Sequence, residues 1–315
     1  FGVPIVARGR GTNTTGATVP IQGGLVLSLE RMDKILVVDP ANRALRVESG
    51  VLNQTAQDAA GKHGFFWPPD PTSAAYCTVG GNIALNAAGP RAVKYGATRE
   101  NILGLVAVTG TGETIHTGCY TTKGAVGYDL TRLLIGSEGT LAVVTEATLK
   151  LTPLPESRRT LQAVYRDIRS ATEAIVAIMT QPVVPYALEF MDAASIEMIR
   201  GYSQTELPRG AGALLIIEVD GQEAGMDAAV AAISKATKTS GLVALAVAKT
   251  KAEADALWAT RKALSPALRN IAPNKLNEDV VVPVSRIPEL IEGLEKLSQE
   301  YGIPIVNFGH AGNGN

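Results

Sequence analysis

The sequence predicts an α+β protein built from two domains. Its 315 residues correspond to about two domains of ordinary size, and 46% apolar with 19% charged residues is a typical globular composition. The first half is rich in glycine and short strand-like runs, whereas strand and helix patterns alternate in the second half. A proline-containing linker at 152–157 separates the two patterns, so we place the domains at residues 1–155 and 156–315.

In the first domain, short apolar runs bounded by turn residues predict strands. These runs are 25–29, 35–39, 44–49, 104–109, 113–117 and 140–151. We expect Asn53 to cap a short helix that runs through Lys62 and is closed by Gly64. From Pro68 to Gly96 we expect one long irregular stretch, and loops of this length inside a compact domain are usually functional.

The second domain is expected to alternate strands with amphipathic helices. Strands are predicted at 161–165, 188–191, 213–219 and 243–247, and helices at 170–179, 226–239, 251–271 and from Ser285 onward. Ile175, Ile178 and Met179 form the apolar stripe of the first helix, and Gly302 ends the last one. This alternation predicts a separate α+β domain.

The charge balance excludes several classes of function. Lys and Arg total 29 and Asp and Glu total 30, so a net charge of −1 gives no general reason to bind nucleic acid. Cys77 and Cys119 are too few for a disulfide-rich scaffold, and no apolar run approaches the roughly 20 residues that span a bilayer. We expect a cytoplasmic protein, with peripheral association with the inner membrane as an alternative.

Both ends of the chain are expected to lie inside a longer protein. The sequence starts at Phe1 without a methionine and stops within a glycine-rich loop after Gly309. We therefore expect a fragment truncated at both ends, from which targeting signals and the oligomeric state are not readable.

Three glycine-rich polar segments occur in the first domain: 8–16, 68–89 and 136–141. The first, Arg-Gly-Arg-Gly-Thr-Asn-Thr-Thr-Gly, suits a loop whose backbone N–H groups bind phosphate. It is not a P-loop, because no Gly-Lys-Ser/Thr follows, and Thr14 stands where a Rossmann loop requires its third glycine. Each segment alone can be a structural turn. Together they favour one large phosphate-bearing cofactor lying across the domain.

These segments resemble the FAD-binding domain of the vanillyl-alcohol-oxidase superfamily. The similar motifs are Arg8–Gly16, Pro69–Ser73, Cys77–Asn82, Lys94–Gly96 and Gly136–Val144. The most similar branch contains the FAD-linked subunit of glycolate oxidase and the D-lactate and D-2-hydroxyglutarate dehydrogenases. The resemblance implies a two-part FAD-binding domain of the PCMH type, followed by a ferredoxin-like α+β substrate or cap domain.

The resemblance also implies the residues that contact FAD. The pyrophosphate loop consists of Arg8, Gly9, Arg10, Gly11, Thr12, Asn13, Thr14, Thr15 and Gly16. The further contacts to flavin and nucleotide are Pro69, Asp70, Ser73, Thr78, Gly81, Asn82, Asn86, Gly139 and Val144. Some relatives attach FAD covalently through a histidine in this loop. Because residues 8–16 contain neither His nor Cys, we expect non-covalent FAD.

The resemblance places the substrate residues in the second domain. The segment from Trp258 to Arg261 is similar to a Trp-x-x-Arg segment whose arginine holds the substrate carboxylate, through two parallel hydrogen bonds. Ser265 lies four residues later on the same helical face and can add a donor. Taken alone, Arg261 is more simply a solvated or ion-paired arginine. Residues 279–283 are also similar to a family segment and are expected to form a strand entering the site.

The last segment, Gly-His-Ala-Gly-Asn-Gly-Asn at 309–315, is similar to a metal-binding loop of these relatives. His310 matches the first histidine ligand of a divalent metal such as Zn or Mn, and Asn313 replaces the usual aspartate. A metal there polarises the 2-hydroxyl group of a substrate. A structural role for His310 is the alternative.

The resemblance therefore implies FAD-dependent oxidation of a small 2-hydroxy acid, glycolate or D-lactate, to the 2-oxo acid. Arg261 is expected to anchor the carboxylate and His310 to bind or deprotonate the 2-hydroxyl, while the C2 hydride passes to flavin N5. The electron acceptor is expected to be a quinone, an iron–sulfur subunit or an electron-transfer flavoprotein. The alternatives are a same-fold flavin oxidase of an alcohol or sugar, and a non-catalytic FAD-binding subunit.

Overall fold

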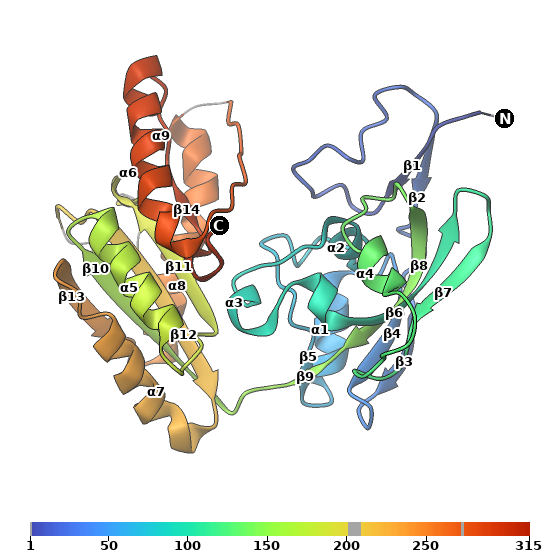
Figure 1. Ribbon diagram of the computed structural model, residues 1–315, viewed down its shortest axis with the longest axis horizontal. Coiled ribbons are helices and arrows are strands. Elements are labelled where there is room, and N and C mark those ends of the chain that lie inside the picture. The colour runs from blue at the N-terminus through green and yellow to red at the C-terminus, as the bar shows by residue number, and fades with distance from the viewer. Residues whose placement is uncertain (1, 201–208, 272–273) are drawn as a thin grey trace. The chain divides into compact units, whose positions relative to one another are not determined.

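The computed structural model describes residues 2–200, 209–271 and 274–315, and leaves out the side chains of 265–266 and 269–271. By its internal contacts the chain divides into two compact units, Phe1–Leu154 and Pro155–Asn315. Figure 1 shows the helices and strands of both units. No helix of the described residues is long and apolar enough to cross a membrane.

The first unit contains a five-stranded antiparallel sheet in the order β3-β4-β8-β6-β7. Its strands are β3 (Ile35–Asp39), β4 (Ala44–Glu48), β6 (Ile102–Thr109), β7 (Thr114–Gly118) and β8 (Ala142–Lys150). Two smaller sheets pair β1 (Ile5–Arg8) with β2 (Leu25–Ser28) and β5 (Phe65–Phe66) with β9 (Thr152–Pro153). The helices are α1 (Asn53–Gly61), α2 (Val79–Leu85), α3 (Ala92–Tyr95) and α4 (Leu130–Leu134), with a 3₁₀ turn at Thr98–Asn101.

The core of this unit lies between the large sheet and helices α1 and α2. Leu45, Leu149 and Ile83 are fully buried there together with Trp67. The indole N–H of Trp67 donates to the Asn101 carbonyl at 3.0 Å, so its polar atom is satisfied inside the core.

Two expectations for the first unit are wrong. Asn53 does not cap helix α1, because Leu52 occupies the capping position and the buried Asn53 amide donates to the Pro69 carbonyl at 3.0 Å instead. The stretch expected to be irregular contains α2 and α3. Helix α2 was not predicted because Gly80 and Gly81 lie in its first turn, and glycine has a low helix propensity. Gly80 is nevertheless required, because a Cβ there would lie 2.7 Å from the Cβ of Ser49.

The second unit contains a five-stranded antiparallel sheet in the order β13-β10-β12-β11-β14. Its strands are β10 (Ser157–Tyr165), β11 (Ala187–Asp192), β12 (Ala213–Gly221), β13 (Leu242–Val247) and β14 (Phe308–Gly309). Helix α5 (Ile168–Thr180) joins β10 to β11 in the chain, and α7 (Glu223–Ala236) joins β12 to β13. This βαββαβ order is the ferredoxin-like arrangement, so the expected fold is confirmed. The remaining helices are α6 (Ala193–Ile199), α8 (Lys251–Ile271) and α9 (Ile287–Tyr301).

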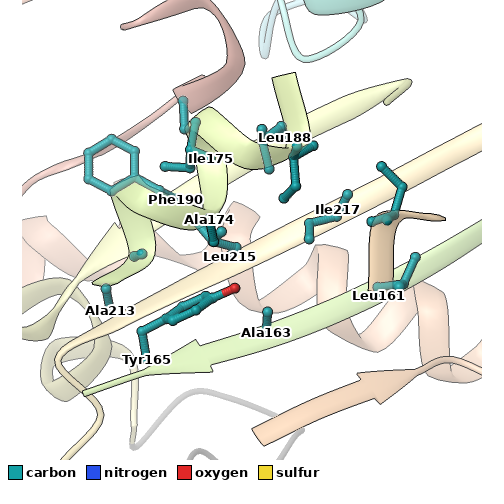
Figure 2. Packing of buried hydrophobic residues seen from close by; sticks show 14 of the residues in the cluster. Leu161, Ala163, Tyr165, Ala174, Ile175, Leu188, Phe190, Ala213, Leu215 and Ile217 are labelled. Atoms are coloured by element: carbon teal, nitrogen blue, oxygen red, sulfur yellow. The ribbon is translucent and has the colours of Figure 1, made fainter. Parts of the chain in front are cut away.

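The two faces of this sheet carry different layers. On one face Leu161, Tyr165 and Leu215 belong to the same buried apolar cluster as Ile175 of helix α5, and Figure 2 labels these residues. Strand residues alternate between faces, so their neighbours point the other way. On that second face a smaller cluster joins the sheet to α6 and α8; it comprises Val164, Met191, Ile196, Ile199, Ala211, Leu214, Ile216, Leu264 and Ala267. The second face is the one from which the candidate site is built.

Expectations for the second unit are also corrected. Residues 279–283 form no strand; Val281 is largely exposed, and Val282 N donates to the Gly314 carbonyl at 2.9 Å. The last helix begins at Ile287, after a 3₁₀ turn over Val284–Arg286, rather than at Ser285. Apolar β-branched residues in this stretch suggested a strand, but no neighbouring strand of the described residues pairs with it.

The core of the second unit gives a stability prediction. Ile175 is 0% exposed, so Ile175→Ala is expected to lower the free energy of unfolding by about 2–5 kcal/mol, through lost apolar burial and the cavity left behind. Denaturant unfolding of the FAD-loaded protein measures the loss. Val243→Ala is the control, because Val243 is 59% exposed on β13. Equal losses for the two variants contradict the placement of Ile175 in the core.

Helix α5 gives a pH-dependent prediction. The Asp167 carboxylate accepts a hydrogen bond from Ser170 N at 2.8 Å, and this bond holds the pKa of Asp167 below its ordinary value of 3.8. Because folding lowers this pKa, the stabilisation is complete above the unfolded-state value and is lost as pH falls through the folded-state value. We expect Asp167→Ala to lower the free energy of unfolding by about 1 kcal/mol near neutral pH. The difference between the two proteins is expected to become smaller below about pH 4.

Denaturant titrations at several pH values measure this cost. Asp167→Asn is the matched control, because the amide oxygen of Asn can cap the helix but the amide does not ionise in this pH range. A difference between the wild-type protein and Asp167→Ala that stays constant into strong acid contradicts the assignment of the effect to this carboxylate.

Candidate functional site

In the first unit, the glycine-rich segments predicted to bind FAD come together. A Cβ on Gly9 would overlap the Thr78 hydroxyl at the start of α2, so the 8–16 loop approaches this helix through bare backbone. Thr15 Oγ1 donates to Glu138 Oε2 at 3.2 Å, which joins the same loop to the turn at 136–139. A Cβ on Gly139 would lie 3.6 Å from that of Ala7. Three segments distant in the sequence therefore form one glycine-lined surface.

Backbone hydrogen bonds hold the 136–139 turn against α2. Gly136 N donates to the Ile83 carbonyl at 2.9 Å, and Glu138 N donates to the Ala84 carbonyl at 3.0 Å. Thr78 caps α2 by accepting from Gly81 N at 3.1 Å. The predicted contact residues Thr78 and Gly81 therefore lie at the start of the helix to which the turn carrying Gly139 is hydrogen-bonded.

Other predicted cofactor residues have partners of their own. Asp70 pairs with Arg91 Nε at 2.8 Å, and Asn86 Oδ1 accepts from Arg99 N at 2.9 Å. Arg10 makes a loose ion pair with Glu30 at 3.5 Å, with its side chain about half exposed. Asp70 therefore contacts the segment that carries Gly89 and Arg91.

Several buried polar atoms of this unit lack a hydrogen-bond partner among the described residues, and one of them, Asn82 Nδ2, belongs to a residue predicted to contact FAD. Asn82 is buried on α2, and among the described residues its Nδ2 has no hydrogen-bond partner, although the side chain interacts with the weakly polar Cys77 thiol. Burial raises the pKa of that thiol, as expected for a packing cysteine. A buried amide donor without a partner, next to a surface of bare backbone, fits a ligand rich in hydrogen-bond acceptors, such as FAD.

The second unit brings together Arg261, Glu189 and His310. Glu189 lies in the middle of β11 and is 1% exposed. Its Oε2 accepts from Arg261 Nε at 3.0 Å and lies 3.0 Å from Nη2, while its Oε1 is 2.5 Å from His310 Nδ1. Because Arg261 and His310 bond to the two oxygens of one carboxylate, their side chains lie beside each other.

Each of the three side chains is positioned by a different element. Arg261 comes from helix α8, and its guanidinium carbon lies 4.7 Å from the centre of the Phe308 ring. Strand β14 pairs Gly309 with Phe190, the neighbour of Glu189, and so places His310 next to β11. Asp192 holds the preceding turn by accepting from Asn307 N at 2.9 Å and Nδ2 at 2.8 Å.

The guanidinium of Arg261 keeps one edge available for a ligand. Its Nε and Nη2 face Glu189, and among the described residues its Nη1 has no hydrogen-bond partner. An arginine carries five N–H donors, so the end formed by Nη1 and Nη2 can still take a carboxylate with two hydrogen bonds. The side chain is 16% exposed, and His310 beside it is 24% exposed.

Sequence reasoning found Arg261 and His310 but missed Glu189. The signal was a single carboxylate within the apolar run Ala-Leu-Glu-Phe-Met. Such a run predicts a strand that is buried on both faces, and a charged side chain on it needs a partner inside the protein. Ser265 lies outside the residues whose side chains are described, so its predicted role is not addressed.

The described residues do not complete a metal site at His310. Among them, no three His, Cys, Asp or Glu side chains are placed to hold a metal ion. His310 instead bonds Glu189 through Nδ1. Among the described residues His310 is thus the one predicted ligand at this place, and metal binding there stays a prediction.

Comparisons with known proteins establish the family. The family model described as FAD linked oxidases, C-terminal domain, matches residues 154–315, and the FAD binding domain model matches residues 1–118. The chain belongs to the FAD-linked oxidases. This confirms the resemblance seen in the sequence, and it confirms FAD as the cofactor.

Named relatives and a solved structure agree with this assignment. The chain is 41% identical to glycolate oxidase subunit GlcD of Bacillus subtilis and 37% identical to D-lactate dehydrogenase of Anaerostipes hadrus, each over 99% of this chain and 67% of the relative. It therefore spans about two thirds of their length. It also shares the fold of alkyldihydroxyacetonephosphate synthase, with a TM-score of 0.66 and 23% identity, over 85% of this chain and 51% of that one.

The glycine contact at the start of α2 gives a prediction. We expect Gly9→Ala to weaken FAD binding about tenfold or more, because the added Cβ overlaps the Thr78 hydroxyl and overpacking costs about 1–3 kcal/mol. Flavin absorbance per protein, followed during dilution, measures the loss. Gly110→Ala is the control, because its Cβ would meet nothing within 4 Å. Full flavin retention in Gly9→Ala contradicts the predicted role of this loop.

Proposed function

We propose that this protein is an FAD-dependent enzyme that oxidises a small 2-hydroxy acid, glycolate or D-lactate, to the corresponding 2-oxo acid. The observation that carries the proposal is Arg261, whose guanidinium is held by a buried carboxylate beside His310 and keeps a carboxylate-binding edge. The names of the relatives support it, because glycolate and D-lactate are both small 2-hydroxy acids.

In this proposal Arg261 binds the substrate carboxylate. Its planar guanidinium can give two parallel hydrogen bonds to the two oxygens, which sets the position of the neighbouring C2. His310 then binds or deprotonates the 2-hydroxyl, because a neutral imidazole has one nitrogen that accepts a proton. FAD, when bound, accepts the hydride that leaves C2. The protein contributes orientation and charge.

The glycine-lined surface of the first unit holds FAD in this proposal. Residues 8–16 contact its pyrophosphate, and the buried Asn82 amide supplies a donor to its polar edge. The attachment is non-covalent, because the 8–16 loop carries no His or Cys side chain to form a bond.

Two alternatives remain distinguishable by experiment. A same-fold flavin oxidase acting on an alcohol or sugar has a neutral substrate, which gives the positive charge of Arg261 no anionic partner. A non-catalytic FAD-binding subunit needs neither Arg261 nor His310. The buried carboxylate that orders both side chains favours an acid-oxidising enzyme over either alternative.

Reduced flavin has to pass its electrons onward. Because one relative is named as a subunit of glycolate oxidase, we propose a partner iron–sulfur subunit, with a quinone or an electron-transfer flavoprotein as other acceptors. We place the protein in the cytoplasm, with peripheral association with the inner membrane as the alternative.

The test of this function is anaerobic reduction of the bound flavin. Glycolate, D-lactate, L-lactate and D-2-hydroxyglutarate are added in turn to the FAD-loaded protein, and the visible absorption is followed. We expect one of the acids to bleach the flavin. Arg261→Lys keeps the positive charge but loses the planar guanidinium, and it is expected to lower the second-order rate constant of flavin reduction about tenfold. Arg261→Ala is expected to lower this rate constant about 100-fold or more.

Other outcomes redirect the proposal. A yellow protein that none of the acids bleaches supports the alcohol or sugar oxidase. A protein that binds no flavin contradicts an FAD-dependent reaction. Bleaching by an acid with equal rates in the wild-type protein and Arg261→Ala excludes Arg261 as the carboxylate ligand.

A further inference from the structure

We propose that Glu138 is a positioning residue of the FAD site, which holds the end of the 8–16 loop in place for the pyrophosphate. Its carboxylate lies on the turn at 136–139, where Oε2 accepts a hydrogen bond from Thr15 Oγ1 at 3.2 Å, across 123 residues of sequence. The inference rests on the proposed binding of FAD by the 8–16 loop, and it adds a residue that does not touch the cofactor.

The backbone of Glu138 is strained. Its φ is +53°, and among the described residues Arg43 and Asn86 are the other non-glycine residues with a positive φ. Asparagine adopts this left-handed conformation more readily than most residues, whereas glutamate has no such preference. Glycine would fit without strain, as it does in the same turn at Gly136 and Gly139, which also have positive φ values. A glutamate at a position that favours glycine points to a role for its side chain.

The turn that carries Glu138 is itself fixed to helix α2. Glu138 N donates to the Ala84 carbonyl at 3.0 Å, and Gly136 N donates to the Ile83 carbonyl at 2.9 Å. Both bonds belong to the backbone, so they do not depend on the side chain at position 138. The carboxylate therefore reaches the loop from an anchored backbone.

Thr15 connects this carboxylate to the backbone of the loop. Its Oγ1 lies 3.2 Å from both Glu138 Oε2 and Asn13 Oδ1, and it accepts from Ala17 N at 3.3 Å. A hydroxyl group has one hydrogen to donate, and an ionised carboxylate is a stronger acceptor than an amide oxygen. Asn13 Oδ1 in addition already accepts from Gly16 N at 3.0 Å. The hydroxyl hydrogen therefore goes to Glu138, and residues 13–17 are held to the turn through it.

The middle of the loop has few internal restraints. Within the described part of the chain, no backbone N–H of residues 10–15 has a hydrogen-bond partner. Such N–H groups suit a phosphate ligand, but a loop without internal bonds loses conformational entropy when it binds. Strand β1, paired with β2 up to Arg8 and Ser28, fixes one end of the loop, and the Thr15–Glu138 bond fixes the other. Because holding both ends lowers this entropy cost, the bond is expected to strengthen FAD binding.

The useful property of Glu138 in this role is its acceptor oxygen and not its charge. A carboxylate beside a loop that binds pyrophosphate repels the ligand. The amide oxygen of glutamine can accept from the Thr15 hydroxyl without carrying a charge. Glu138→Gln is therefore expected to bind FAD at least as tightly as the wild-type protein, whereas a variant without an acceptor binds it more weakly.

Glu138→Gly tests the inference, because it removes the acceptor and the backbone strain together. The full-length protein is freed of FAD and titrated with it, and binding is followed by flavin fluorescence. The Kd for FAD is expected to rise about three- to tenfold, the effect of one hydrogen bond. The midpoint of thermal unfolding of the flavin-free protein is expected to rise or to stay within about 2 °C of the wild-type value. A purely structural role would lower affinity and stability together.

Arg43→Gly is the matched control for the relief of strain. Arg43 has a φ of +52° in the turn between β3 and β4, and its side chain makes no hydrogen bond or ion pair with the described residues. Its replacement by glycine changes the backbone in the same way without removing a contact to the 8–16 loop. The Kd for FAD is therefore expected to stay unchanged in Arg43→Gly.

Thr15→Val removes the donor of the same hydrogen bond and keeps the size of the side chain. If the two residues act through this bond, the loss of affinity in the double variant with Glu138→Gly is smaller than the product of the two single losses. Glu138→Ala replaces Glu138→Gly in this comparison if the glycine variant fails to fold.

Four results overturn the inference. These are wild-type FAD affinity in Glu138→Gly, a Glu138→Gln variant that binds as weakly as Glu138→Gly, single losses that multiply in the double variant, and a loss of stability that matches the loss of affinity. The proposed role of the loop fails separately, when Gly9→Ala keeps full FAD affinity. The proposed oxidation fails when no 2-hydroxy acid bleaches the flavin of the wild-type protein, and the FAD titrations still decide the role of Glu138 in that case.

Discussion

A carboxylate buried in the centre of a strand has to be neutralised within hydrogen-bond distance, and this requirement organises the second unit. Glu189 is almost completely inaccessible to water on β11. It is paired by Arg261 from α8 and by His310 from the loop after β14. Helix α8, strand β11 and the C-terminal loop are consequently held at one place on the sheet, where Arg261 and His310 lie beside each other.

In the first unit, glycine residues bring distant segments close together. A large dinucleotide needs backbone N–H groups at close range, and side chains at the contact points would prevent this approach. Gly9 and Gly80 are positions where a Cβ would collide with Thr78 or Ser49. Bare backbone therefore brings the segments of the first unit close together, whereas a buried carboxylate with its two partners brings the segments of the second unit together.

The comparisons show why fold alone does not decide chemistry. Alkyldihydroxyacetonephosphate synthase shares this fold at 23% identity, while its name denotes a different kind of product from those of the glycolate and D-lactate enzymes. Enzymes on one scaffold differ through the side chains that face the substrate. In this chain the family establishes the scaffold and the cofactor, and Arg261, Glu189 and His310 are the side chains that distinguish the site.

Much of this was determined by the sequence itself, because strand and helix periodicities and glycine-rich loops are local properties of the chain. These local patterns predicted β3 with both ends correct and the full extent of α8. The assignment of particular residues to FAD, and of Arg261 and His310 to the substrate, came from the resemblance to a flavoprotein family and stays a prediction. The sequence did not reveal helix α2, in which Gly80 is required by its packing against Ser49, or the absence of a strand at residues 279–283. Only the tertiary structure disclosed Glu189, because its partners lie 72 and 121 residues away along the chain. No local pattern encodes which distant charges will share a buried carboxylate; the folded sheet decides that by placing them on one face.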